Sequence, residues 1–334
     1  MAVRVGINGA GRIGRALWRV SLTRPGVSVV AVNDLTAPPV LARLLAHDSV
    51  RGPLPVPVYR GADGLLVDGA PVRTFACAKP GEVPWGQLGV DVVVEATGRF
   101  FAADDARQHL AAGARRVVVS TATVDADVHV FPGVNDAALE PARHRLISPG
   151  CCTGTASAPI LAALRPFGLR SCLMTTVHAY DPTKSVLHDG PHPNLRMGRA
   201  AALNIVPAPL KAGSVVALER AFPELTGRIA GLHLRVPVAI GCAVILTVRL
   251  ARPAAAAELN RELALAAGTG TAGHMTYTED PIVSTDVVGA AQACIVDGAW
   301  TRVSGAEASV LGWYDNEWGF ANRLADLVAA AGKG

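Results

Sequence analysis

Lysine, aromatic residues and long apolar runs are all scarce in this sequence. Only four of its 31 basic residues are lysines, and aromatic residues make up 5% of its 334 residues. Because no basic run is interleaved with aromatic residues, we expect no nucleic-acid partner. No apolar run approaches the roughly 18 residues that cross a bilayer, so we expect no membrane partner either.

The sequence also lacks any cysteine pattern that would indicate disulfides or a bound metal. Its six cysteines are scattered apart from the adjacent pair Cys151 and Cys152, and none has CxxC spacing. This distribution predicts neither a disulfide framework nor a metal site. The N-terminus has the pattern of a strand and no apolar signal segment, so we expect a cytoplasmic location.

The composition is that of a folded globular protein with room for two domains. Half of the residues are hydrophobic, 17% are charged, and the net charge is +4. Over residues 1–150, short continuous apolar runs alternate with alanine-rich helical segments, which is typical of a parallel sheet covered on both faces. This pattern predicts a doubly wound α/β domain. We expect strands at 3–7, 27–32, 90–95 and 116–120, helices at 12–23, 39–46 and 104–112, and a small antiparallel insertion at 53–74.

Residues 151–315 have a different pattern, with longer alternating strands and few helices between them. We expect an α+β catalytic domain with a mostly antiparallel sheet, a helix at 153–164, and strands at 172–178, 227–236 and 243–250. Residues 181–204 lack periodicity, and an irregular loop of that length inside a domain is usually functional. A last helix is predicted at 316–330, and residues 316–334 are expected to pack back onto the first domain.

A glycine-rich turn, Gly9-Ala10-Gly11-Arg12-Ile13-Gly14, follows the first strand and opens the first helix. Such glycines allow a tight turn, the approach of a pyrophosphate to the helix N-terminus, and close packing of helix on strand. Asp34 ends the second strand 20 residues after Gly14, where an acid that binds the adenosine ribose is expected. Leu35 offers no donor to a 2′-phosphate. The combination predicts a Rossmann domain that binds NAD; the alternative is that Asp34 only caps the next element.

A candidate nucleophile stands at the junction of the two halves. Cys152 lies two residues after Gly150 and just before the helix predicted at 153–164, and a helix N-terminus lowers a thiol pKa. His178 ends a predicted strand and could serve as a base. Taken alone, a buried cysteine at a helix start is more often inert than catalytic, and a single histidine at a strand end can be structural.

With these positions in place, the sequence resembles the glyceraldehyde-3-phosphate dehydrogenase family. The similar blocks run in order from residue 3 to about residue 328. They include Asn8-Gly9, Arg12-Ile13-Gly14-Arg15, Asn33-Asp34-Leu35, Glu95-Ala96-Thr97-Gly98, Gly198-Arg199-Ala200-Ala201, Leu234-Arg235-Val236-Pro237 and Trp313-Tyr314-Asp315-Asn316-Glu317-Trp318-Gly319.

The resemblance implies a role for each matching residue. Cys152 would be the nucleophile, and His178 would be its base and would hydrogen-bond the oxyanion as it forms. Asn316 would hold the nicotinamide carboxamide, and Arg235 would bind substrate phosphate or inorganic phosphate. The dinucleotide would be bound by Gly9, Gly11, Arg12, Ile13, Gly14 and Asp34, with Thr97 and Ser120 beside it.

The resemblance also implies the reaction and the partners. Glyceraldehyde 3-phosphate would be oxidised with NAD, as in glycolysis, through a thioester on Cys152. Inorganic phosphate would then release 1,3-bisphosphoglycerate. The family loop at 181–204 reaches the cofactor site of a neighbouring subunit, which implies a homotetramer.

The segments that would bind anions depart from the family pattern. Cys151 replaces a serine before the nucleophile, whereas Thr153 after it is retained. Asp181 stands where a phosphate-binding threonine is expected, with Thr183 two positions later, and a carboxylate there repels phosphate unless a cation compensates. Lys211 lies where the family has hydroxyls and a glycine amide, and it could bind an anion as a point charge.

Three interpretations remain open at this point. The first is a phosphorylating glyceraldehyde-3-phosphate dehydrogenase with an altered anion pocket, which could also exclude an inhibitor that attacks Cys152. The second is a family member that oxidises another aldehyde, such as erythrose 4-phosphate, or that releases the acid by hydrolysis. The third is a cofactor-binding relative used as a redox sensor or interaction protein, against which the retention of Cys152, His178, Arg235 and Asn316 argues.

Overall fold

The structure is a computed structural model that describes residues 2–180, 189–270 and 274–333. The chain divides into two compact units. The N-terminal unit contains the chain up to Gly150 together with the residues from Ala321 onward, and the C-terminal unit is Cys151–Phe320. Among the described residues, no helix is both long enough and apolar enough to cross a membrane.

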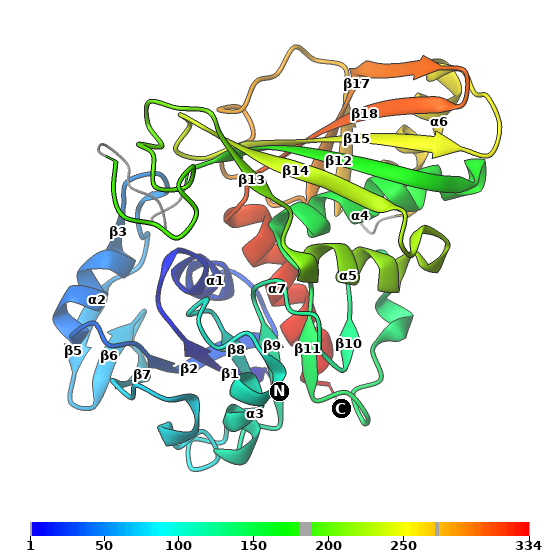
Figure 1. Ribbon diagram of the computed structural model, residues 1–334. Helices are drawn as coiled ribbons and strands as arrows, with labels where there is room; N and C mark the ends of the chain where they lie inside the picture. Colours follow the sequence, from blue (N-terminus) through cyan, green and yellow to red (C-terminus); the bar gives the residue numbers. More distant parts are fainter. Residues whose placement is uncertain (1, 181–188, 271–273, 334) are drawn as a thin grey trace. The chain divides into compact units, whose positions relative to one another are not determined.

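A nine-stranded sheet forms the centre of the N-terminal unit, in the order β10-β11-β9-β8-β1-β2-β7-β6-β5. Neighbours from β10 to β7 pair in parallel, and β7, β6 and β5 pair antiparallel (Figure 1). The strands are β1 (Val3–Asn8), β2 (Val27–Asn33), β5 (Val58–Gly61), β6 (Gly64–Val67), β7 (Ala70–Phe75), β8 (Val92–Glu95), β9 (Arg116–Val119), β10 (Val128–His129) and β11 (Leu146–Ser148). Two further short strands, β3 (His47–Asp48) and β4 (Gly52–Pro53), pair only with each other.

Two neighbouring strands of this sheet, β8 and β9, are buried along their whole length. Every residue of β8 and of β9 is buried, so these strands show no alternation between a core face and a solvent face. Such strands need cover on both faces, as the continuous apolar runs predicted. The helices of this unit are α1 (Arg12–Leu22), α2 (Pro38–Ala46), α3 (Ala103–Ala111) and most of α7 (Trp318–Ala331). The doubly wound α/β class predicted from the sequence is confirmed.

The C-terminal unit contains a seven-stranded sheet in the order β13-β14-β12-β15-β18-β17-β16. Its pairs are antiparallel except for β12 with β14 and β16 with β17, which confirms the predicted mostly antiparallel sheet. The strands are β12 (Leu169–Ala179), β13 (Val206–Pro209), β14 (Ile229–Val236), β15 (Cys242–Leu250), β16 (Met275–Thr278), β17 (Cys294–Ser304) and β18 (Glu307–Tyr314). The helices are α4 (Cys152–Leu164), α5 (Ala212–Ala221) and α6 (Ala256–Leu265).

Helix α4 is the buried element on which this second sheet packs. Almost all of its residues are buried, and it contacts β12, β15, β17 and β18 as well as α5 and α6. Because β18 alternates between buried and partly exposed residues, only one of its faces belongs to this core. The other face of the sheet carries the exposed side chains of Leu173 and Leu232.

Three sequence expectations need correction. The segment 53–74 forms antiparallel strands as expected, but it is no separate insertion, because β7 joins the main sheet parallel to β2. The last helix begins at Trp318 rather than at residue 316, because Asp315 Oδ1 accepts the backbone N–H groups of Glu317 and Trp318 and so caps the helix. Strand β13 was not expected because it holds Pro207 and Pro209, which are tolerated at the edge of a sheet.

The long aperiodic segment has no helix or strand over residues 189–204. This agrees with the irregular loop expected there. The rest of that prediction, residues 181–188, lies outside the described residues.

Candidate cofactor pocket and thiol site

The glycine turn after β1 has the geometry for which glycine is required. Gly9 has φ of +96°, and a Cβ there would lie 2.7 Å from the backbone nitrogen of Thr97. A Cβ on Gly14 would lie 2.1 Å from the carbonyl oxygen of Gly9, so helix and turn pack in direct contact. Gly11 caps α1 and has no atom within 4 Å of a Cβ position. The turn is therefore closed on its protein side and open beside Gly11, where the N-terminus of α1 favours an anion.

Asp34 follows β2 and is hydrogen-bonded to the backbone of this glycine turn. Its carboxylate accepts the backbone N–H of Ala10 at 2.7 Å and that of Thr36 at 2.8 Å. These two bonds leave lone pairs on both oxygens for ribose hydroxyls. The alternative, that Asp34 only caps the next element, explains the bond to Thr36 but does not explain the bond to Ala10.

A cavity of about 260 Å³ opens where β1, β2, β7 and β8 end. We call this row of strand ends, with the cavity above it, the cofactor edge. Parallel α/β sheets bind ligands outside the carboxyl ends of their strands. Of the residues predicted to bind a dinucleotide, Gly9, Gly11, Asp34 and Thr97 line the cavity, whereas Arg12, Ile13, Gly14 and Ser120 do not. The lining also includes Asn8, Asn33, Cys77, Ala96, Arg99 and Phe100, which the sequence predictions missed.

Three of the missed residues share a feature that the sequence could have indicated. Asn8, Asn33 and Cys77 stand at or just after the ends of strands that the sheet order places side by side. Position at the end of a parallel strand was therefore the available cue. Which ends are neighbours depended on the sheet order, and in particular on β7, which the sequence had assigned to an insertion.

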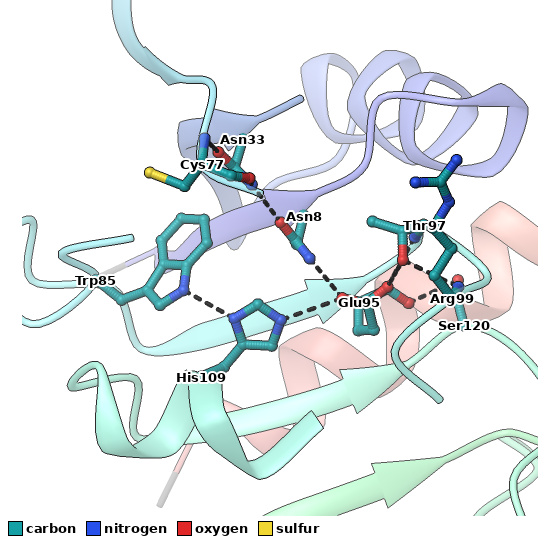
Figure 2. Close-up of polar contacts among 9 residues, drawn as sticks. All are labelled: Asn8, Asn33, Cys77, Trp85, Glu95, Thr97, Arg99, His109 and Ser120. Carbon is teal, nitrogen blue, oxygen red and sulfur yellow. Dashed lines mark hydrogen bonds and ion pairs between the residues drawn. The ribbon is translucent and has the colours of Figure 1, made fainter. Parts of the chain in front are cut away.

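Glu95, the last residue of β8, joins several of these strand ends (Figure 2). Its side chain accepts hydrogen bonds from the side chains of Asn8, His109 and Thr97 and from the backbone N–H of Thr97. Its carbonyl oxygen accepts the backbone N–H and the hydroxyl of Ser120, both at 2.9 Å. Thr97 and Ser120, the two residues expected beside the dinucleotide, are thus both held by Glu95.

In the C-terminal unit, Cys152 is the first residue of α4 and Cys151 is its N-cap. The sulfur of Cys152 lies 3.5 Å from Nε2 of His178, which stands near the end of β12. Nδ1 of His178 lies 2.7 Å from the carbonyl oxygen of Ala179. A carbonyl only accepts, so Nδ1 carries the proton and Nε2 is left to accept the thiol proton of Cys152. The tautomer is the one that a base for this thiol requires.

At this helix start, the thiol whose pKa is lowered is that of Cys151, the neighbour of Cys152. Hydrogen bonds with Cys152, with Ser214 and with two backbone N–H groups lower the pKa of Cys151. The pKa of Cys152 is raised, first by its hydrogen bond with Cys151 and then by burial. The two thiols therefore titrate as a pair, and the low pKa expected for Cys152 stays a prediction. One helix N-terminus serves both thiols, and Cys151 receives more of its donors.

Positive charge lies next to this pair. Arg235 is opposite His178 in the register of β14 with β12, and its Nη1 donates to the carbonyl oxygen of Ala179 at 3.3 Å. Arg235 also acts to lower the pKa of Cys152. We call Cys151, Cys152, His178 and Arg235 the thiol site.

Lys211, a further predicted anion ligand, lies at the start of α5, the helix that borders the thiol site through Ser214. Lys211 is the exposed N-cap of α5, and Ser214 on the same helix places its hydroxyl 2.9 Å from the sulfur of Cys151. His233 on β14 is buried, and burial together with the charges of Arg235 and Lys211 lowers the pKa of His233 to about 4. An imidazole with this pKa is neutral near pH 7.

The side chain of Thr153 is already hydrogen-bonded within the C-terminal unit, whereas that of Asn316 has a buried acceptor without a partner among the described residues. The hydroxyl of Thr153 is buried and lies 3.1 Å from the hydroxyl of Tyr314, so it is already engaged inside the unit. Asn316 follows β18, and its buried Oδ1 has no hydrogen-bond partner among the described residues. An acceptor of this kind fits the amide group of a nicotinamide. The other two predicted anion ligands, Asp181 and Thr183, lie outside the described residues.

Comparisons with known proteins assign both units to one family. The family model of the glyceraldehyde 3-phosphate dehydrogenase NAD binding domain matches residues 3–103, and that of the C-terminal domain matches residues 151–316. The chain is 43% identical over 335 residues to glyceraldehyde-3-phosphate dehydrogenase 2 of Streptomyces avermitilis, covering 99% of both chains. It is 45% identical over 327 residues to glyceraldehyde-3-phosphate dehydrogenase of Kitasatospora aureofaciens, covering 97% of this chain and 98% of the other. The enzyme of the same name from Mycobacterium avium is 43% identical over 341 residues, covering 100% of this chain and 99% of its own.

An open glycine turn with an acid beside it and a cysteine paired with a histidine fit an NAD-dependent oxidoreductase. The chain belongs to the glyceraldehyde-3-phosphate dehydrogenase family. NAD is its cofactor, and the residues of the cofactor edge fit that molecule.

Proposed function

We propose that this protein oxidises glyceraldehyde 3-phosphate to 1,3-bisphosphoglycerate with NAD and inorganic phosphate. The observation that carries the proposal is the pairing of Cys152 with His178, in the tautomer that accepts a thiol proton, in a chain of this family. The relatives compared above bear the name of this activity over nearly their whole length. Residues 1–150, with the C-terminal helix, would be the NAD-binding domain and residues 151–315 the catalytic domain.

The first step forms a bond between the sulfur of Cys152 and the aldehyde carbon. The thiol proton goes to Nε2 of His178, and the imidazolium then donates to the oxygen of the hemithioacetal. When bound, NAD accepts the hydride that leaves this carbon. His178 takes the hydroxyl proton at the same time, so that a thioester on Cys152 remains.

The second step transfers the acyl group to inorganic phosphate. A phosphate oxygen attacks the thioester carbon, the carbon–sulfur bond breaks, and the sulfur of Cys152 leaves as the thiolate. Arg235 and Lys211 supply positive charge for the phosphate groups. Cys151 and Thr153, and also Asp181 and Thr183, are proposed to border the same pockets.

A second candidate is oxidation of another aldehyde, such as erythrose 4-phosphate, or release of the acid by hydrolysis. It is favoured by the internal bonds of two proposed anion ligands, since Cys151 contacts Ser214 and Thr153 contacts Tyr314. Groups engaged in this way have less bonding capacity left for phosphate than free hydroxyls have.

Turnover measurements distinguish these functions. We would follow NADH formation with glyceraldehyde 3-phosphate and with erythrose 4-phosphate, each with and without inorganic phosphate. The main proposal expects the faster rate with glyceraldehyde 3-phosphate and a strict need for phosphate. No turnover of that aldehyde would refute it, and an equal rate without phosphate would establish hydrolysis instead.

We also propose that the protein works as a homotetramer in the cytoplasm. Support for self-association comes from large apolar side chains that are exposed in the single chain, including Leu173 at 57%, Trp300 at 59% and Leu203 at 75%. Exposed apolar groups of this size often mark protein contacts. Light scattering on the purified protein would measure the assembly directly, and a monomeric mass would contradict it.

A further inference from the structure

An unbroken line of hydrogen-bonded side chains crosses the N-terminal unit beneath the cofactor pocket (Figure 2). Asn33 donates to Oδ1 of Asn8 at 2.7 Å, and Asn8 donates to Oε2 of Glu95 at 2.5 Å. The same Oε2 lies 3.1 Å from Nε2 of His109, whose Nδ1 lies 2.9 Å from the indole nitrogen of Trp85. We call these five residues the Glu95 network.

The network joins three neighbouring strand ends to a helix. Asn33 ends β2, Asn8 ends β1 and Glu95 ends β8, which are adjacent in the sheet, while His109 lies on α3. Asn8 and Asn33 line the pocket itself. Asn33 also exchanges two hydrogen bonds with the backbone of Cys77, so the fourth strand end of the cofactor edge is tied to the same line.

The direction of every bond near the helix is fixed by chemistry. An indole N–H only donates, so Nδ1 of His109 must be the acceptor. Its Nε2 therefore carries the proton and donates to Glu95. Glu95 is 1% exposed and His109 is 0% exposed, so neither bond can be replaced by bulk water if its partner is removed.

Glu95 influences the pocket through the residues to which it is hydrogen-bonded. Besides Asn8, it holds both the backbone N–H and the hydroxyl of Thr97, and the Thr97 hydroxyl in turn accepts the backbone N–H of Arg99 at 3.1 Å. Thr97 and Arg99 line the pocket, while the backbone of Thr97 lies directly against Gly9 of the glycine turn. A shift of Glu95 would therefore move both walls of the pocket together.

We propose that Glu95 and His109 are positioning residues for NAD binding. His109, held in one tautomer by Trp85, fixes the Glu95 carboxylate, and Glu95 fixes Asn8 and Thr97 on either side of the glycine turn. The proposal depends on NAD as the cofactor and is independent of which aldehyde the protein oxidises.

The test measures the Kd of NAD by calorimetry on three variants. Glu95→Gln keeps the side-chain shape but turns one accepting oxygen into a donor that faces other donors. His109→Leu removes both of the histidine's bonds. Each is expected to raise the Kd about tenfold, since one unmatched buried hydrogen bond is worth about 1.4 kcal/mol, which is tenfold in Kd. His109→Gln keeps one donor and one acceptor and is expected to stay within about threefold of wild type.

A matched control separates positioning from general loss of stability. Leu65 is 1% exposed on β6 of the same unit and takes no part in the network. Leu65→Ala should lower the melting temperature while leaving the Kd of NAD unchanged at a temperature where the variant is folded. If Leu65→Ala raises the Kd as much as His109→Leu does, or if Glu95→Gln binds NAD as tightly as wild type, the proposal is overturned.

The division between binding and turnover gives a second readout. Because the network contacts the pocket and not the reacting thiol, His109→Leu should raise the KM for NAD about tenfold and change kcat at saturating NAD less than twofold. The double variant Glu95→Gln with His109→Leu should show little more loss than either single variant, since both act on the same bonds. Fully additive effects would overturn the proposed coupling.

Discussion

The cofactor edge and the thiol site differ in how their buried polar groups are satisfied. At the cofactor edge, each side-chain nitrogen and oxygen of Asn8, Glu95 and His109 has a hydrogen-bond partner. In the C-terminal unit, Oδ1 of Asn316 and Nδ1 of His233 are buried without a partner in the described part of the chain.

This difference matches what each region has to do. A satisfied network holds the backbone of a pocket in one arrangement before its ligand arrives. Buried groups that lack a partner lower stability and keep their bonding capacity for a ligand. The cofactor edge is therefore built as a rigid support, whereas Asn316 and His233 in the C-terminal unit keep bonding capacity that a ligand can satisfy.

The largest expected effect breaks the thiol site alone. Cys152→Ala removes the nucleophile and should reduce turnover by roughly a thousandfold or more, since no other group can form the thioester. The Kd of NAD, measured by calorimetry, should stay unchanged because the cofactor edge is untouched. Cys172→Ala is the matched control, as Cys172 is buried in β12 outside the thiol site. Retention of turnover by Cys152→Ala would refute the thioester mechanism.

The next effect breaks the cofactor edge alone. Gly9→Ala forces a Cβ to within 2.7 Å of the Thr97 nitrogen at φ of +96°, so the turn must open. We expect the Kd of NAD to rise roughly 30-fold, about 2 kcal/mol. Gly26→Ala is the control, because Gly26 has φ of +93° but no atom within 4 Å of its Cβ position. An equal loss of NAD affinity in both variants would show that backbone strain, and not the close approach to Thr97, is responsible.

A smaller effect is expected from Cys151→Ser, which tests how Cys151 influences the pKa of Cys152. The hydrogen bond to Cys151 is the first cause of the raised pKa of Cys152, so Cys151→Ser should lower that pKa. More of Cys152 is then the thiolate near pH 7, and its alkylation by iodoacetamide should be about tenfold faster, with the pH midpoint moved to lower pH. Fragment-ion mass spectrometry locates the label on Cys152. A slower or unchanged rate would show that Cys151 does not raise the pKa of Cys152 in wild type.

The same variant tests the anion pocket. A serine hydroxyl is a stronger donor than a thiol, so Cys151→Ser should change the KM for inorganic phosphate more than the KM for the aldehyde. Steady-state kinetics with each substrate varied in turn measures both constants. Equal changes in the two would indicate that Cys151 does not border the phosphate pocket.

The smallest effect concerns the cap that precedes α7. Asp315→Ala removes the acceptor for the N–H groups of Glu317 and Trp318, and also the one for the N–H of Gly289, and should lower the free energy of unfolding by about 1–2 kcal/mol. Denaturant titration measures this loss. Asp315→Asn keeps an oxygen for Glu317 and Trp318 but places its amide nitrogen against the N–H of Gly289, so it should recover only part of the loss. Full recovery would show that the bond from Gly289 contributes little.

The sequence was sufficient where one local pattern determines one local structure. The glycine turn, Asp34 and α4, whose start was predicted one residue late, came from adjacent residues, because tight turns and helix N-termini depend on their immediate neighbours. It was not sufficient for β7, which reads as part of a hairpin yet pairs with β2, nor for β13 with its two prolines. Partners in a sheet depend on contacts far apart in sequence, which periodicity does not encode.

The sequence by itself determined the family of this protein, and it predicted a nucleophile, its base and a dinucleotide turn. Tertiary structure decided which polar groups share their partners. Glu95 and His109 are 14 positions apart in the sequence, and only the packing of α3 against the end of β8 makes them one buried pair. Cys151 and Cys152 are neighbours in the sequence, but it is the approach of Ser214 from α5, with the backbone donors at the start of α4, that lowers the pKa of Cys151. Hydrogen bonds and burial act over a few ångströms in space, so protonation and positioning follow from the fold rather than from the order of residues.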